Sequence, residues 1–368
     1  MPNPIRKDVF VSDRVGPDPG FAVLRKSADF CENQYLRQLI IRESQYPESK
    51  IYNELAIVDK ELFDSIEDGD IGFITKNGSV RVVLSKNANH NTLLVTERCD
   101  NACLFCSQPP KDVQDDWLLV QSAMAIAAFQ STETIGISGG EPLLYKETFI
   151  RFLDFLCKHA STTPLHILSN GRAFSDPAFA KAIADRCQTL NLTFGIPLYS
   201  SVEEMHDHLV GADGAFRETL LGLINAGNSG VPIELRIIPT SMNFKVLPNL
   251  INLIARCFSN IAQISIMNLE PAGWARRNWK ELYITPLHYH HYLVEAIQQA
   301  KRADLQVKLF NYPLCHLPEE LQGYSVQSIS DWKNYYPEVC SSCKLKFKCA
   351  GFFTSSTGKF HDQARAIV

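Results

Sequence analysis

Strand-like and helix-like patterns alternate between residue 91 and about residue 300, and this alternation restricts the possible folds more than any other feature of the chain. Short runs rich in aliphatic and β-branched residues predict six strands: Thr92–Thr96, Thr134–Ser138, Leu165–Ser169, Leu190–Ile196, Ile233–Pro239 and Ile261–Leu269. The intervening segments predict five helices: Leu118–Phe129, Thr148–His159, Ala178–Cys187, Ala215–Ala226 and Val246–Cys257. Strand–helix–strand units of this length make right-handed crossovers, so the strands should form a parallel sheet.

Six units are too few for a closed eight-stranded barrel, and no dinucleotide-binding glycine pattern follows the first strand. We therefore expect an α/β fold whose core is an open (β/α)6 barrel. In barrels of this kind the chemistry gathers at the carboxyl ends of the strands. The residues that directly follow the predicted strands are thus the first candidates for a functional site.

The segments on either side of this core have a different character. Residues 1–90 predict a small β-rich domain, for which a packing role and a peptide-docking role are equally open. Its predicted strands and hairpin turn are Glu54–Ile57, Ile71–Thr75, Val80–Leu84 and Asn77-Gly78. After a predicted helix at Pro286–Ala300, residues 301–368 are rich in Cys, Ser, Lys and aromatic residues, which is typical of segments held together by metal ligands. We therefore predict three parts, at 1–90, 91–300 and 301–368.

Composition and charge indicate a globular protein of a reducing compartment. A net charge of −4 over 368 residues argues against a surface that coats nucleic acid. The N-terminus lacks the apolar core of a signal peptide and no stretch is long enough to span a membrane, so we expect a cytoplasmic protein without a membrane partner. In that compartment the eleven Cys indicate metal or redox chemistry rather than disulfides.

Cys99, Cys103 and Cys106, here called the Cys triad, have Cys-x3-Cys-x2-Cys spacing directly after the first predicted strand of the core. Iron–sulfur clusters normally take four Cys ligands, so a local set of three would leave one iron of a [4Fe–4S] cluster open to a small molecule. Zinc is the alternative, but zinc loops usually use Cys-x2-Cys pairs completed by a second pair or by His. The spacing therefore favours a catalytic [4Fe–4S] cluster.

A second motif, Gly139-Gly140-Glu141-Pro142, ends the second predicted strand. Its glycines allow a ligand to approach the backbone closely, its carboxylate can accept hydrogen bonds from an amine, and its proline fixes the exit of the turn. Alone, this motif would be an ordinary strand-to-helix turn. Because it follows the Cys triad by one βα unit, it indicates a functional site.

Four more Cys lie toward the C-terminus and are here called the C-terminal Cys set: Cys315, Cys340, Cys343 and Cys349. Zinc is a serious alternative for four Cys with the Cys-x2-Cys-x5-Cys spacing of the last three. In a chain that already carries the Cys triad, we favour an auxiliary [4Fe–4S] cluster.

Together, the Cys triad and the Gly-Gly-Glu-Pro motif resemble the radical S-adenosylmethionine (SAM) superfamily, whose core is an open six-unit barrel. The resemblance implies an oxidoreductase in which the cluster passes an electron from a donor to SAM, and a 5′-deoxyadenosyl radical then abstracts hydrogen from the substrate. It also implies SAM contacts at Phe105, Gly139, Gly140, Glu141, Pro142, Ser169, Asn170 and Arg236. Arg236 should meet a carboxylate, and we expect Glu234 to face the other side of the sheet and not to be its partner.

The C-terminal Cys set resembles the core of the SPASM extension found on peptide-modifying members. Phe353 stands where a further Cys of the full pattern would fall, so the set resembles the shorter twitch form with one auxiliary cluster.

Longer runs between about residue 89 and the end are similar to one of the two paired radical SAM maturases of the His-Xaa-Ser peptide system. These runs are Asn89–Cys99, Cys106–Lys111, His206-Asp207, Gly214–Phe216, Ser330–Lys333 and Cys349–Phe353. The similarity implies a ribosomally made precursor peptide as substrate, and a second radical SAM maturase and a small accessory protein as partners. Two alternatives stay open: a radical SAM enzyme that acts on a small molecule or cofactor precursor, and a non-catalytic iron–sulfur scaffold for a paired maturase.

Overall fold

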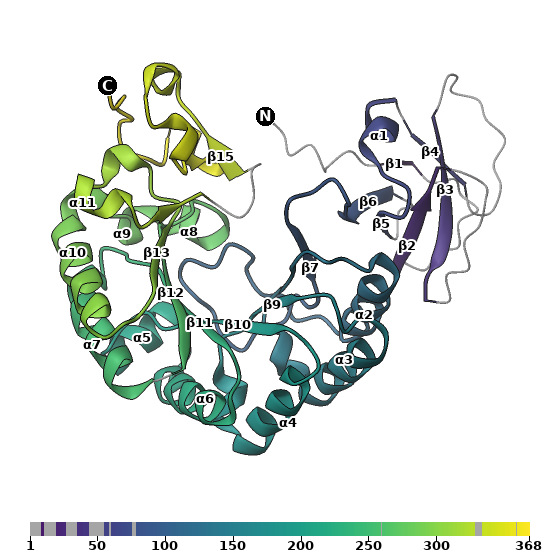
Figure 1. The fold of residues 1–368 in the computed structure, drawn as a ribbon, viewed down its shortest axis with the longest axis horizontal. Helices are drawn as coiled ribbons and strands as arrows, with labels where there is room; N and C mark the ends of the chain where they lie inside the picture. The colour runs from purple at the N-terminus through teal and green to yellow at the C-terminus, as the bar shows by residue number, and fades with distance from the viewer. Residues whose placement is uncertain are drawn as a thin grey trace.

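A computed structural model describes residues 9–10, 20–26, 35–43, 55–58, 60–75, 79–258, 260–327, 333–357 and 359–368. Its centre is a sheet of eight strands in the order β14-β13-β12-β11-β10-β9-β8-β7, and every neighbouring pair in it is parallel. The strands are β7 (Asn91–Leu94), β8 (Ile135–Ser138), β9 (Leu165–Leu168), β10 (Leu192–Pro197), β11 (Ile233–Ile237), β12 (Ile261–Met267), β13 (Val307–Phe310) and β14 (Ser325–Val326). The sheet curves into an open barrel (Figure 1).

Helices cover the convex side of this sheet (Figure 1). The six long ones are α2 (Trp117–Phe129), α3 (Lys146–His159), α4 (Pro177–Cys187), α6 (Ala215–Ser229), α7 (Leu247–Cys257) and α10 (Pro286–Arg302). The predicted α/β fold with an open barrel is confirmed, and the sheet has two more strands than the six predicted. The added strands, β13 and β14, lie beyond the expected end of the barrel near residue 300, and β14 has only two residues.

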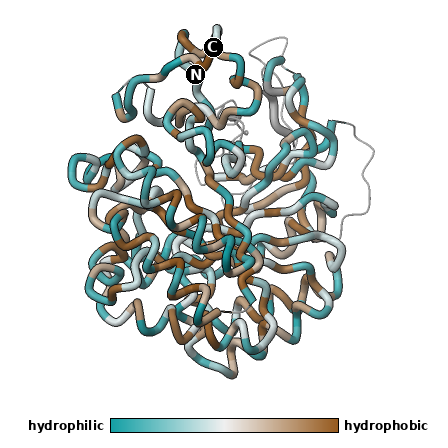
Figure 2. The backbone as a smooth tube through the Cα atoms, turned by 60° about the vertical axis from the view of Figure 1, so that its left-hand side comes forward, coloured by the Kyte–Doolittle hydropathy of each residue, from teal (hydrophilic) through white to brown (hydrophobic). Residues whose placement is uncertain are grey.

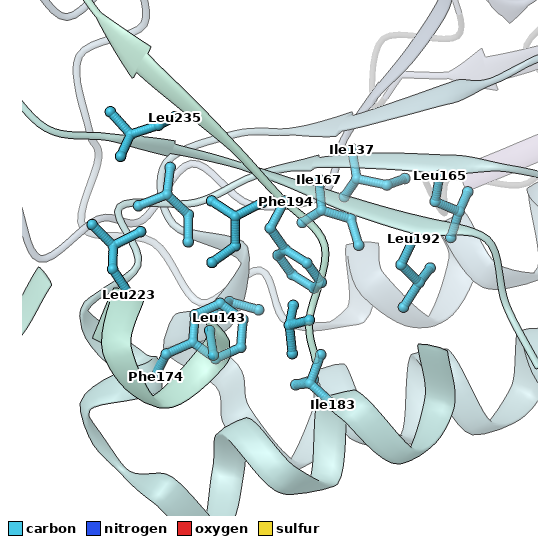
Figure 3. Packing of buried hydrophobic residues seen from close by; sticks show 14 of the residues in the cluster. Ile137, Leu143, Leu165, Ile167, Phe174, Ile183, Leu192, Phe194, Leu223 and Leu235 are labelled. Carbon is cyan, nitrogen blue, oxygen red and sulfur yellow. The ribbon is translucent and has the colours of Figure 1, made fainter. Parts of the chain in front are cut away.

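The core lies between the sheet and these helices. Apolar residues at alternate positions of the strands, such as Ile137, Ile167 and Phe194, point toward the helices and are fully buried (Figure 3). They pack against helix residues such as Ile183 and Leu223. Because strand side chains alternate between faces, the remaining strand positions point into the barrel, and we call that side the concave face. In Figure 2, polar and apolar residues alternate along the helices, as expected when only one side of each helix is buried.

The N-terminal region forms a separate sheet of six strands, in the order β1-β6-β5-β2-β3-β4, with both parallel and antiparallel pairs. Its elements are β1 (Val9–Phe10), β2 (Gly20–Arg25), β3 (Arg37–Glu43), β4 (Leu55–Val58), α1 (Lys60–Ser65), β5 (Ile71–Ile74) and β6 (Ser79–Leu84). β5 and β6 pair antiparallel, while the predicted turn Asn77-Gly78 lies outside the described residues, as does Glu54. The sheet contacts the barrel at α2, where the Phe73 and Trp117 rings stack with centroids 6.4 Å apart.

The C-terminal segment contains little regular structure. It includes α11 (Glu319–Gln322), several 3-10 turns, and a two-stranded sheet of β15 (Asn334–Tyr335) and β16 (Phe352–Phe353). In the described residues, no helix is long and apolar enough to cross a membrane.

Candidate active site

The Cys triad lies on the loop that leaves the carboxyl end of β7, and all three residues are half-buried. Backbone hydrogen bonds hold this loop on two sides. The amide of Ala102 donates to the carbonyl of Val210 at the end of α5 (Glu203–Val210), at 2.8 Å. The amide of Trp274 in α8 (Gly273–Arg277) donates to the carbonyl of Cys106, also at 2.8 Å. The path of the loop is therefore fixed by main-chain contacts.

The thiols of the triad are protonated in the protein without metal. Burial raises the pKa of both Cys99 and Cys103 to about 12, and it also raises the pKa of Cys106. Because thiolates are the metal-binding form, loading of a cluster must displace these protons. Among the described residues, no three His, Cys, Asp or Glu side chains gather closely enough to hold a single metal ion.

The Gly-Gly-Glu-Pro motif follows β8 and contacts the Cys loop directly. The amide of Gly140 donates to the carbonyl of Thr96 (2.9 Å), and the amide of Glu141 donates to the carbonyl of Arg98 (2.7 Å). A Cβ atom on Gly140 would lie 1.9 Å from the Arg98 oxygen, and one on Gly139 would lie 2.3 Å from the Thr96 oxygen. We expected the glycines to admit a ligand; in the structure, the backbone that they admit is that of the Cys loop.

Glu141 joins the second and third strand ends. Its buried carboxylate accepts hydrogen bonds from the amide of Leu143 (2.8 Å), the hydroxyl of Ser169 (2.8 Å) and the amide of Asn170 (2.6 Å). Burial raises the pKa of Glu141 to about 7, although the hydrogen bonds from Asn170 and Leu143 oppose that shift. An ionised carboxylate offers about four acceptor sites, so three internal donors leave room for about one more. Glu141 is both a structural joint and a possible acceptor for a ligand.

The loop after β9 returns to the Cys loop through Asn170, a predicted site residue, and through Arg172, which sequence reasoning missed. The side-chain amide of Asn170 donates to Asp100 Oδ1 (2.6 Å). Arg172 donates to the carbonyl of Asp100 (2.9 Å) and to Asn101 Oδ1 (2.7 Å), and its Nε donates to Glu218 on α6 (2.6 Å). Asp100 and Asn101, two polar residues between the first two Cys, were the sequence feature that could have indicated this network. The ends of β7, β8 and β9 are thus linked in one hydrogen-bonded network.

Tyr199, just after β10, connects the Cys loop with the concave face. Its ring is buried and lies edge-on to Phe105, with centroids 4.7 Å apart. Burial raises the pKa of the Tyr199 hydroxyl. Tyr199 therefore packs against the Cys loop through the ring of Phe105.

The position of Glu234 corrects one expectation. Glu234 and Arg236 are two residues apart on β11, so both side chains point to the concave face. We had expected them to face opposite sides. Glu234 nevertheless pairs with another residue, because its Oε2 atom lies 2.5 Å from Nε2 of His166 on β9.

The C-terminal Cys set lines one small cavity of about 10 Å³, beside Tyr336 and Arg365. Amides of Leu314 and Gly351 donate to Cys349 Sγ at 3.3 Å each, and the Ile367 amide donates to Cys343 Sγ at 3.4 Å. Burial raises the pKa of Cys315 and of Cys340. Four thiols around one cavity are a donor set that suits either a [4Fe–4S] cluster or zinc. Phe353 is buried in β16, so that position packs against its surroundings.

Comparison with known proteins agrees with this arrangement. A family model described as the radical SAM superfamily matches residues 93–253, a range that runs from β7 into α7 and includes both motifs. The chain carries a radical SAM domain. A domain of this superfamily implies a [4Fe–4S] cluster and SAM as cofactors.

The relatives differ in how much they share with this radical SAM protein. A probable GTP 3′,8-cyclase from Pyrobaculum aerophilum is 23% identical over 264 residues, which cover 68% of this chain and 77% of that protein. An Fe-coproporphyrin III synthase from Methanosarcina barkeri is 27% identical over 186 residues, which cover 49% of this chain but only 43% of that protein. The solved structure of Streptococcus suis SuiB bound to S-adenosylmethionine has a TM-score of 0.50 and 12% identity, and the match covers 74% of this chain and 75% of that one. This last likeness shows a shared fold.

Proposed function

We propose that this radical SAM enzyme modifies a ribosomally made peptide of the His-Xaa-Ser type. The observation that carries its radical chemistry is the join between the Cys triad and the Gly-Gly-Glu-Pro motif at the carboxyl ends of β7 and β8. When bound, the cluster and SAM supply an electron transfer and a 5′-deoxyadenosyl radical able to abstract hydrogen from an unreactive position.

The protein's own residues hold and orient these groups. The Cys triad would hold the cluster, since three thiols on one fixed loop suit three irons. Glu141 would accept the ammonium group of SAM at its remaining acceptor site, while Ser169 and Asn170 keep its carboxylate oriented. Phe105 and Arg236 are proposed as contacts to the adenine and the carboxylate of SAM. Pro142 starts the 3-10 turn at Pro142–Tyr145 that Glu141 caps.

The C-terminal Cys set is proposed to hold an auxiliary [4Fe–4S] cluster. Amides that donate to sulfur, as at Cys343 and Cys349, are the kind of contact that tunes such a cluster. If this cluster takes part in the reaction, Ala variants of Cys340 or Cys343 should lose peptide modification but keep some SAM cleavage. Normal modification by both variants would make the site purely structural.

The peptide substrate is supported by the long runs similar to His-Xaa-Ser maturases, most of them in the described part of the chain. A precursor peptide, a paired maturase, a small accessory protein and an electron donor in the cytoplasm follow from the same proposal. A small-molecule substrate is the second candidate, because the relatives above are named for a GTP cyclase and a coproporphyrin synthase. A non-catalytic scaffold fits less well, since a scaffold has no need to keep the Gly-Gly-Glu-Pro motif.

The decisive experiment is anaerobic reconstitution with SAM, a reductant and a His-Xaa-Ser peptide, with and without the accessory protein, followed by mass spectrometry. A change in peptide mass that depends on SAM is the expected result. If SAM is cleaved but no peptide is ever modified, the small-molecule alternative replaces this proposal.

A further inference from the structure

Three charged or titratable side chains meet on the concave face of the barrel, below the candidate active site. His166 projects from β9, and Glu234 and Arg236 project from β11. Leu235, between the last two, points to the helix side (Figure 3), which places its neighbours inside the barrel. The side chains of His166 and Glu234 are mostly buried, with 21% and 12% of their surface exposed. Their contact is therefore shielded from water.

Gly195 on β10 allows His166 to reach Glu234. β10 lies between β9 and β11, and Gly195 is the register partner of both Leu168 and Glu234. A Cβ atom on Gly195 would lie 2.8 Å from Cδ2 of Leu168, 3.1 Å from Cδ of Arg236 and 3.2 Å from Nε2 of His166. All three distances are tighter than ordinary contacts. Because Gly195 has no side chain, the side chains of His166 and Glu234 can meet above β10.

Arg236 is left without an ionic partner. Among the described residues, no carboxylate oxygen lies within ion-pair distance of its guanidinium. One of its terminal nitrogens contacts Met267 Sδ at 2.9 Å, which is a weak acceptor, and its buried Nε has no hydrogen-bond partner. Arg236 as a whole is half-buried, but a buried guanidinium Nε without a partner is costly, and a ligand that accepted its hydrogen bond would remove that cost.

The carboxylate best placed to form an ion pair with Arg236 is that of Glu234, two residues away on the same face of β11. Burial works to raise the pKa of Glu234, but the hydrogen bond with His166 and the charge of Arg236 lower it to about 2, so the group is ionised. Its oxygen nevertheless lies at His166 and not at Arg236.

We propose that His166 holds the Glu234 carboxylate away from Arg236, and thereby reserves the Arg236 guanidinium for the carboxylate of a ligand bound in the barrel. His166 and Glu234 are positioning residues in this scheme, because they act on the ligand through Arg236. The proposal rests on the proposed function insofar as the ligand is the SAM carboxylate or a carboxylate of the substrate.

The first test measures binding to the iron–sulfur-loaded protein by equilibrium dialysis, with SAM and with decarboxylated SAM. His166→Ala frees Glu234 to pair with Arg236, so SAM should bind about ten- to a hundredfold more weakly, the range for a hydrogen bond between charged groups. Decarboxylated SAM should bind as it does to the unaltered protein. The double variant His166→Ala/Glu234→Gln should regain SAM affinity, since no carboxylate then competes. A double variant that binds as weakly as the single one, or a single variant with unchanged affinity for every carboxylate ligand, would overturn the proposal.

Two further variants test whether the position of the His166 side chain matters when no polar or charged group has been removed from the His166–Glu234–Arg236 cluster. Gly195→Ala should weaken SAM binding as His166→Ala does, without removing any polar group. Thr193→Ala, also on the concave face of β10, should leave it unchanged. If SAM affinity does not respond but the KM for a peptide does, and the response is lost when that peptide's carboxylates are amidated, the carboxylate belongs to the substrate.

A crystal structure of His166→Ala without ligand tests the inference independently of any activity. Glu234 should lie within 4 Å of Arg236 in that variant, the usual limit of an ion pair. If the Glu234 carboxylate stays in its present position in this variant, His166 does not keep it away from Arg236, and the proposal is refuted. Failure of the unaltered protein to bind SAM at all would instead count against the proposed function, and this structure would still decide the role of His166.

Discussion

Glu141→Gln should weaken SAM binding while the fold survives. A glutamine side chain has one carbonyl oxygen, so it can serve Leu143 and Ser169 or else Asn170, but not both sides. One buried amide then loses its partner, which costs about 1–3 kcal/mol of the free energy of unfolding. Loss of the charge removes an ammonium contact worth about 1.5–3 kcal/mol, or about ten- to a hundredfold in SAM affinity.

The pH dependence sharpens this test. Burial raises the pKa of Glu141 from 4.5 to about 7, so the carboxyl is neutral below neutral pH in the protein without SAM. SAM affinity should therefore fall about tenfold between pH 8 and pH 6, because one proton must leave before the ammonium binds. The raised pKa also makes the folded protein lose stability as pH rises from 4.5 through 7, by about 3 kcal/mol at about 1.4 kcal/mol per unit. Both contributions should be absent from Glu141→Gln.

The assay is equilibrium dialysis of anaerobically loaded protein with SAM across this pH range, alongside urea unfolding. Glu147→Gln is the matched control, since the same chemical change occurs at an exposed residue of α3 and should alter stability by less than about 0.5 kcal/mol. A Glu141→Gln protein with normal iron content that binds SAM within twofold of the unaltered enzyme at pH 8 would place the ammonium elsewhere.

Three other outcomes are expected. Ala at all three positions of the Cys triad should abolish reductive SAM cleavage, and any cleavage that persists in the triple variant would contradict the assignment of the cluster. Protein purified without oxygen should carry about eight irons, two clusters' worth, whereas about four irons with one zinc would assign the C-terminal Cys set to zinc. Gly140→Ala should lower the melting temperature and SAM affinity together, because its Cβ atom would lie 1.9 Å from the Arg98 oxygen; Gly323→Ala, which meets open space, serves as the control, and equal melting temperatures would refute the steric account.

The open barrel could be predicted from the sequence, because the periodicity of the alternating strand and helix segments indicates which residues lie between the sheet and the helices. β14 was missed because a run of two residues carries almost no periodic information. β13 is as long as β7, β8 and β9, but it lies beyond residue 300, in the segment that was expected to be held together by metal ligands. The alternation of strand side chains could also have placed Glu234 and Arg236 on the same face of β11, because they are two positions apart. The sequence prediction instead treated them as neighbouring residues, whose side chains face opposite sides. The partners of Glu141 could not be foreseen, since Ser169 and Asn170 lie 28 and 29 residues further along the chain.

The contacts that hold the Cys loop have a consequence for how such proteins diverge. The hydrogen bonds donated by Ala102, Gly140 and Trp274 join main-chain amides to main-chain carbonyls, so they do not depend on the side chains of these residues. Position 140 is the exception, because the close approach of the Arg98 oxygen requires glycine there. Substitutions can therefore accumulate along this loop while its course is preserved.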